Sequence, residues 1–153
     1  MKAIVEELRE RGVTVKTKDK SRLMRLIGVV LGLFGLDFNR FWTTIGPRTI
    51  YAPVGTRLTA GELERQRVII EHELVHIGQA RRWLGWFQLS YLLLPLPFGL
   101  AYFRWVWERR AYLVDIRAGR LSIEEVVDTL WASYGWCWPR PLMRRWFERE
   151  VSR

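Results

Sequence analysis

The chain has 153 residues, 49% of them hydrophobic, which is enough for one domain with its own core. Its formal net charge of +9 favours acidic partners: anionic lipid, nucleic acid or an acidic protein surface. The single cysteine, Cys137, excludes an internal disulfide and suits a reducing compartment. The charged start "MKAIVEELRERG" is not typical of a signal peptide, so we expect a cytoplasmic protein, with a peripheral position on a membrane as the alternative.

The chain begins with a predicted helix and a predicted strand. Residues 2–11 are amphipathic, and Gly12 is a typical helix end. "VTVKT" (13–17) alternates apolar and polar residues, as a half-buried strand does. A basic patch follows, which consists of Lys16, Lys18, Lys20, Arg22 and Arg25.

Two apolar stretches come next. "LIGVVLGLFGL" (26–36) is apolar on all sides but too short to cross a bilayer, which predicts a helix that is buried or touches a membrane. "FWTTIGPRTIYAP" (41–53) is rich in Thr, Ile, Tyr and Trp and predicts two short β segments around Gly46-Pro47.

The second half of the chain is predicted to be largely helical. Thr59 and Glu62 have the spacing of a capping box, so they predict the start of a helix that continues to about Trp83. "RWVWERRAYLVDIRAG" predicts a helix that stops at Gly119, and Ser122 caps the next one, "IEEVVDTLWASYG". The tail from 136 is aromatic and basic, and its prolines separate it from that helix.

Residues 86–103 carry no charge and have the minimum length of a transmembrane helix. Pro95 and Pro97 lie at the centre, where they would leave backbone groups that lipid cannot satisfy. We therefore predict a bent, hairpin-like insert with two apolar arms. Flanking tryptophans and arginines are typical of a membrane-interface anchor, and equally of an apolar lid or a dimer patch.

Both histidines lie in "VIIEHELVHIGQA" (68–80), four residues apart. Side chains four apart stack on one helix face, so His72 and His76 can direct two imidazoles at one tetrahedral zinc ion. Glu73 is about 100° around the helix, poorly placed as a ligand but able to reach a metal-activated water as a general base. The alternative is a pair of histidines on a packed helix face.

The third ligand cannot be a histidine. The candidates are Cys137, Glu108, Asp115, Glu124, Glu125 and Asp128. Glu108, on a downstream helix, can complete a site of two histidines and one glutamate; the alternative is a surface charge. Asp115 follows two turns later on the same face, either as a partner for the free nitrogen of a ligand histidine or as a surface aspartate. Cys137, as a fourth ligand, would close the site against water.

"HELVH" with the downstream "ERRAY" resembles the gluzincin metallopeptidases, the thermolysin-like clan, and is similar to small uncharacterised bacterial and phage proteins. The resemblance covers about residues 41–118. It implies that His72, His76 and Glu108 are zinc ligands and Glu73 is the general base. It also implies that "TIYAP" is an edge strand that holds an extended peptide.

The chain departs from the thermolysin pattern in three respects. It is far shorter, Tyr112 stands four residues after Glu108 in place of an aspartate, and no downstream histidine remains to stabilise an oxyanion. Tyr134, Tyr112 and Tyr51 are the alternative donors, each of which can also be a packing residue. Tyr134, in the aromatic turn "SYGWCWP", is our predicted catalytic partner of Glu73.

Together these observations predict an α+β fold, with a small antiparallel or mixed sheet packed on a central HExxH helix, as one minimal zincin-like domain over 1–153. The predicted function is a zinc-dependent endopeptidase with Zn²⁺ as cofactor and a peptide or protein as substrate. The alternative is a non-catalytic or latent zinc-binding interaction module, associated with an anionic membrane. Nucleic acid ranks lower, because the basic residues are spread along the chain without a reader motif.

Overall fold

The computed structural model describes residues 2–33, 37–83, 86, 102–133 and 138–153. The strands are β1 (Thr14–Thr17), β2 (Thr43–Ile45) and β3 (Thr49–Ala52). The helices are α1 (Ile4–Glu10), α2 (Arg22–Gly32), α3 (Ala60–Arg65), α4 (Arg67–Trp83), α6 (Tyr102–Arg117), α7 (Ile123–Ser133) and α8 (Arg140–Val151). Two short 3₁₀ turns are η1 (Lys18–Lys20) and η2 (Phe38–Arg40).

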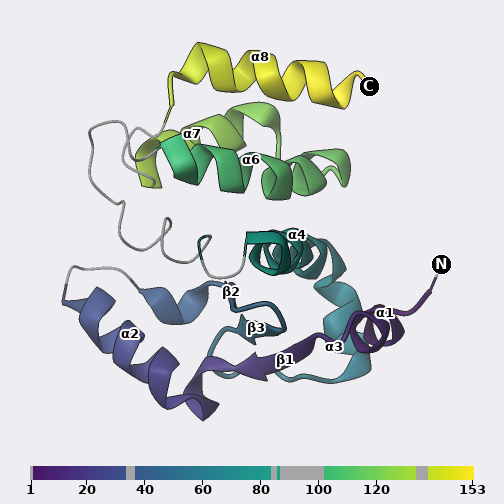
Figure 1. Cartoon of the computed structure of the whole chain (residues 1–153), viewed down its shortest axis with the longest axis vertical. Coiled ribbons are helices and arrows are strands. Elements are labelled where there is room, and N and C mark those ends of the chain that lie inside the picture. The colour runs from purple at the N-terminus through teal and green to yellow at the C-terminus, as the bar shows by residue number, and fades with distance from the viewer. Residues whose placement is uncertain (1, 34–36, 84–85, 87–101, 134–137) are drawn as a thin grey trace.

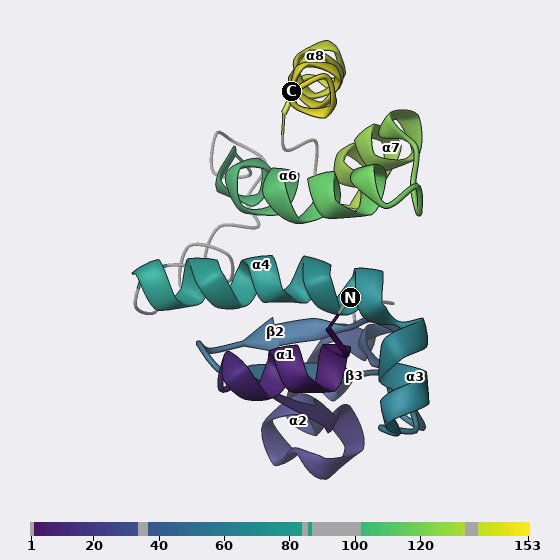
Figure 2. The same cartoon turned by 90° about the vertical axis from the view of Figure 1, so that its right-hand side faces the viewer.

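These elements stack in layers around α4, the helix that carries both histidines. The sheet lies on one side of α4, and α6 and α7 lie on the other, with α8 beyond them (Figure 1). The quarter-turn view shows the same order and places α2 on the side of the sheet away from α4 (Figure 2). The predicted α+β class, with a small mixed sheet packed on this helix, is confirmed.

The sheet has the order β1-β3-β2. β2 and β3 form an antiparallel hairpin whose turn contains Gly46 at φ 70°, and β1 pairs with β3 in parallel. The central strand is therefore β3, and the prediction that "TIYAP" is an edge strand is wrong. The hairpin pattern in the sequence predicts only the pairing of β3 with β2. The second neighbour of β3 is β1, from the N-terminal region, and this long-range pairing has no local sequence signal. The two edge strands of this sheet are β1 and β2.

Two hydrophobic clusters lie on either side of the α4–α6 contact. The N-terminal cluster joins α1, the sheet, α3 and α4, and contains Ile4, Leu8, Val13, Ile50, Leu63, Ile70, Leu74 and Ile77. The C-terminal cluster joins α6, α7 and α8, and contains Trp105, Tyr112, Leu113, Val126, Val127, Leu130, Met143 and Phe147. Between them, Ala80 of α4 packs with Trp107 of α6.

Most helix boundaries lie at the capping residues, glycine and proline that predict them in the sequence. Ser122 and Glu125 form the predicted reciprocal cap of α7, with hydrogen bonds of 2.8 and 3.2 Å. Thr59 accepts the Glu62 N–H at 3.3 Å, but the helix predicted to run on to Trp83 is interrupted at Gln66 and becomes α3 and α4. Gly119, at φ 70°, follows α6 as predicted. The tail beyond Pro139 forms α8.

Some predictions fall outside the described residues. They concern most of the apolar insert, 87–101, and both Tyr134 and Cys137. Among the helices that are described, none combines the length and the apolar character needed to cross a membrane.

Candidate metal centre

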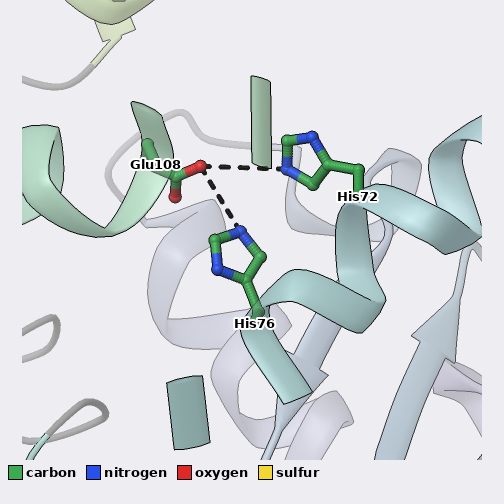
Figure 3. A group of neighbouring side chains, drawn as sticks. All are labelled: His72, His76 and Glu108. Carbon is green, nitrogen blue, oxygen red and sulfur yellow. Dashed lines mark ion pairs between the residues drawn. The ribbon is translucent and has the colours of Figure 1, made fainter. Parts of the chain in front are cut away.

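Helix α4 presents two different faces because its apolar residues and its histidines have different helical positions. Ile70, Leu74 and Ile77 lie in the N-terminal cluster with the sheet. His72 and His76 are one turn apart and point toward Glu108 of α6, as Figure 3 shows. The amphipathic pattern thus packs the apolar face of α4 on the sheet, and it directs the two imidazoles toward α6.

The three side chains meet at one carboxylate oxygen. Glu108 Oε2 lies 3.4 Å from His76 Nε2 and 3.8 Å from His72 Nε2 (Figure 3). The three potential ligand atoms all lie within 4.8 Å of one another. Of the described residues, they form the group that is close enough to hold a metal ion.

The two separations from Glu108 Oε2 are close to those between zinc ligands. Ligands placed tetrahedrally at about 2.0–2.1 Å from zinc are about 3.3–3.5 Å apart. The two distances to Glu108 are at or slightly above that range. Two imidazole nitrogens and one carboxylate oxygen are also a donor set that zinc accepts.

His72 is oriented by a buried aspartate. Its Nδ1 lies 2.6 Å from Asp115 Oδ2, and Asp115 Oδ1 accepts a second hydrogen bond from Arg120 Nε at 2.7 Å. Asp115 is fully buried, so it is not a surface residue. Burial alone would raise the pKa of Asp115, but the bonds from His72 and Arg120 outweigh it and hold that pKa below its ordinary value. With Nδ1 as the donor to Asp115, Nε2 of His72 has the lone pair that a metal needs.

His76 has an equivalent support from within α4. Its Nδ1 lies 2.9 Å from Gln79 Oε1, and Gln79 Nε2 donates to the Trp107 carbonyl at 2.8 Å. The second bond orients the Gln79 amide with its oxygen toward the histidine. Burial would lower the pKa of His76, but the Glu108 carboxylate outweighs it and raises that pKa to about 9.

Glu73 lies on the sheet side of the two histidines. It is buried, and its Oε2 accepts a hydrogen bond of 2.7 Å from Thr44 Oγ1 of β2. Thr44 is paired with the buried Ile50, so both face α4. The edge strand β2 therefore holds the carboxylate of the HExxH glutamate beside the histidine pair.

Lys18, one of the residues of the basic patch in the sequence, is a buried cation. It is 1% exposed, donates to the Phe38 carbonyl and lies 3.6 Å above the Phe38 ring. Burial lowers its pKa to about 8, and the charges of Glu73 and Asp37 oppose this shift. The sequence does not reveal the burial of Lys18 or the contact of Thr44 with Glu73, because both depend on segments far away along the chain.

The other predicted carboxylate ligands are engaged elsewhere. Glu124 pairs with Arg144, Asp128 pairs with Arg140, and Glu125 caps α7. All three lie on α7, away from the histidine pair.

The tyrosine candidates for an oxyanion donor differ in position. Tyr112 is buried, with its ring edge-on to His72 at 5.0 Å, which is a packing position against a potential ligand. Tyr51 follows Ile50 in β3, so its side chain points to the other face of the sheet from α4. Tyr134, like Cys137, is not among the described residues.

Comparison of the chain with protein-family models, with curated proteins and with solved structures found no match.

Proposed function

We propose that this chain is a zinc-dependent metallopeptidase of gluzincin type. The observation that carries the proposal is the convergence of His72 Nε2, His76 Nε2 and Glu108 Oε2, with Glu73 buried beside them. The order of the ligands, two histidines on one helix and a glutamate on a later helix, is the order that the resemblance implies. A closed structural site would have four protein ligands, whereas three leave room for water.

Each residue has a distinct role in this proposal. His72, His76 and Glu108 hold the ion, while Asp115 and Gln79 fix the imidazole orientation. Bound zinc supplies a Lewis acid that activates water and polarises a carbonyl group. Glu73 accepts the proton of the attacking water and passes it to the leaving amine. Tyr134 remains the proposed oxyanion donor.

The substrate is a peptide or an unfolded protein segment. β2 is the edge strand nearest Glu73, since Thr44 contacts that carboxylate. An extended peptide that pairs with β2 would therefore lie next to the proposed base. We therefore propose that the substrate pairs with β2, instead of the "TIYAP" strand that the resemblance indicated.

A second candidate function is supported by the low exposure of the three ligands. Their side chains are 12%, 8% and 3% exposed for His72, His76 and Glu108. A latent or purely structural zinc site would have this burial. Such a module would bind zinc but cleave nothing.

The test is the substitution Glu73→Gln, compared with Glu71→Gln on the same helix. Each zinc-loaded protein is incubated with a complex peptide mixture, and new termini are read by mass spectrometry. We expect cleavage by wild type and by the Glu71 variant, and a loss of at least about a hundredfold in the Glu73 variant, which retains its zinc. Equal cleavage by all three would refute the assignment of Glu73.

Zinc binding without cleavage in the wild type would favour the latent module. Absence of stoichiometric zinc would refute both functions, because both depend on the same three ligands.

A further inference from the structure

Helix α2 has an unusual apolar surface. Its outward side chains are Leu23 at 51% exposure, Leu26 at 62%, Val29 at 66%, Val30 at 45% and Leu33, just after the helix, at 81%. At about 100° per residue these five lie within an arc of about 120°. They form one continuous stripe, which we call the α2 apolar face.

The opposite side of α2 is fixed to the protein. Met24 is fully buried, and Gly28 lies so close to η2 that a Cβ there would be 3.3 Å from the Asn39 side chain. The inner side thus supplies the contacts that anchor the helix. The α2 apolar face is exposed and is not needed for them, and α2 itself lies on the side of the sheet away from α4 (Figure 2).

Positive charge borders this apolar face. Lys20, Arg22 and Arg25 are exposed, and α2 itself contains no acidic residue. None of the three forms an ion pair with any other described residue, whereas Arg40 of η2 pairs with Asp37. These three cations therefore have no ion-pair partner within the described part of the chain, and their sign matches the net charge of +9.

We propose that the α2 apolar face docks on an anionic membrane surface. An apolar stripe inserts into the boundary between headgroups and acyl chains, while flanking arginines bind the lipid phosphates. Long arginine side chains can keep their charge at headgroup level while their stems lie along the apolar layer. The proposal is independent of the peptidase activity, because no proposed ligand or base lies on α2.

Self-association through this face is less favourable on the same observations. A symmetric dimer through this face would bring Arg22 and Arg25 of both copies to an interface to which α2 contributes no acidic residue. Like charges in an apolar contact cost free energy, whereas an anionic lipid surface compensates them.

Vesicle flotation of the full chain tests the proposal. We expect wild type to float with vesicles that contain about one-third phosphatidylserine, and to remain unbound with phosphatidylcholine alone. Raising the salt concentration should weaken binding, because the charge interaction is screened. Failure to float with the anionic vesicles, or equal binding to both kinds, would overturn the assignment.

Matched variants locate the docking face. Leu26→Asp should reduce binding about tenfold or more, whereas Leu142→Asp, at an exposed leucine of α8, should leave it unchanged. The double variant Arg22→Glu and Arg25→Glu should also reduce it about tenfold or more. The charge-matched control, Arg48→Glu with Arg57→Glu, should lose less, because both arginines lie outside α2.

Two outcomes would assign the face differently. Binding that survives both α2 variants would place the lipid contact elsewhere on the chain. A wild-type dimer in sedimentation velocity that Leu26→Asp converts to a monomer would identify a second copy, and not lipid, as the occupant.

Discussion

Asp115 is the residue that most directly sets the orientation of His72. Its carboxylate is fully buried and accepts hydrogen bonds from both His72 and Arg120. Asp115→Asn keeps the shape but removes the charge that favours an Nδ1–H donor on the imidazole. We expect zinc affinity to fall about 10–100-fold, as for other outer partners of ligand histidines.

Competition with a zinc-binding dye measures this change. Asp128→Asn is the control, because Asp128 is exposed on α7 and pairs only with Arg140 among the described residues. Equal affinities of the two variants would show that the Asp115 charge does not support the site.

Lys18 predicts a specific pH dependence of stability. Its folded-state pKa of about 8 lies below the ordinary 10.5, because burial disfavours the charged form. The unfolded chain therefore binds more protons between these two values, and the free energy of unfolding rises with pH from about 8 to about 10.5. Lys18→Met lacks this contribution. The free energy of unfolding of the wild type should rise relative to that of Lys18→Met by up to about 1.4 kcal/mol per pH unit in that window.

Urea unfolding at pH values across the window tests the Lys18 prediction. Lys20→Met, at an exposed lysine of the same 3₁₀ turn, should show no such relative change. A difference between wild type and Lys18→Met that stays constant with pH would contradict the buried, shifted lysine.

At the scale of elements, the sequence predicts what local chemistry determines. The cap at Ser122, the glycine after α6 and the alternation in β1 all depend on neighbours a few residues away. The interruption at Gln66 was missed, because the apolar and polar pattern continues across it.

Long-range contacts set the limit of such predictions. The pairing of β1 with β3 makes β3 central, and no feature of "TIYAP" alone reveals it. The exposure of helix α2 also depends on long-range contacts. Its apolar pattern is compatible with either a buried helix or a helix that touches a membrane, and in the structure most of its outer face is exposed. In the candidate site, spacing identifies His72 and His76. The hydrogen bond from Thr44 to Glu73 and the charge interaction between Lys18 and Glu73 arise only through the tertiary fold.

The α7 cap gives a prediction at this scale. Ser122→Ala removes the hydroxyl that accepts the Glu125 N–H, so an orphan donor remains at the start of α7. We expect the free energy of unfolding to fall by about 1 kcal/mol. Ser152→Ala, after the end of α8, should change it by less than about 0.5 kcal/mol. Chemical denaturation compares the two, and equal effects would contradict a stabilising cap.

For the whole molecule, the candidate metal centre lies between two halves of the fold. The N-terminal cluster ends at α4 and the C-terminal cluster begins at α6, and the three potential ligands come from both helices. A bound ion would therefore link the halves and stabilise the entire fold.

Thermodynamic linkage gives the size of this effect. At free zinc about 1,000-fold above Kd, the free energy of unfolding should rise by about 4 kcal/mol. His72→Ala should abolish most of the response, and calorimetry with and without chelator measures it. A zinc-dependent increase that persists in the variant would place the ion elsewhere.

The central claim is that His72, His76 and Glu108 bind one zinc ion and leave a position open to solvent. X-ray absorption spectroscopy of the zinc-loaded chain tests it directly. We predict two imidazole nitrogens at about 2.0–2.1 Å with oxygen neighbours from Glu108 and solvent, and the loss of one nitrogen in His76→Ala. A sulfur neighbour at about 2.3 Å would instead identify Cys137 as a closing ligand and contradict the open site.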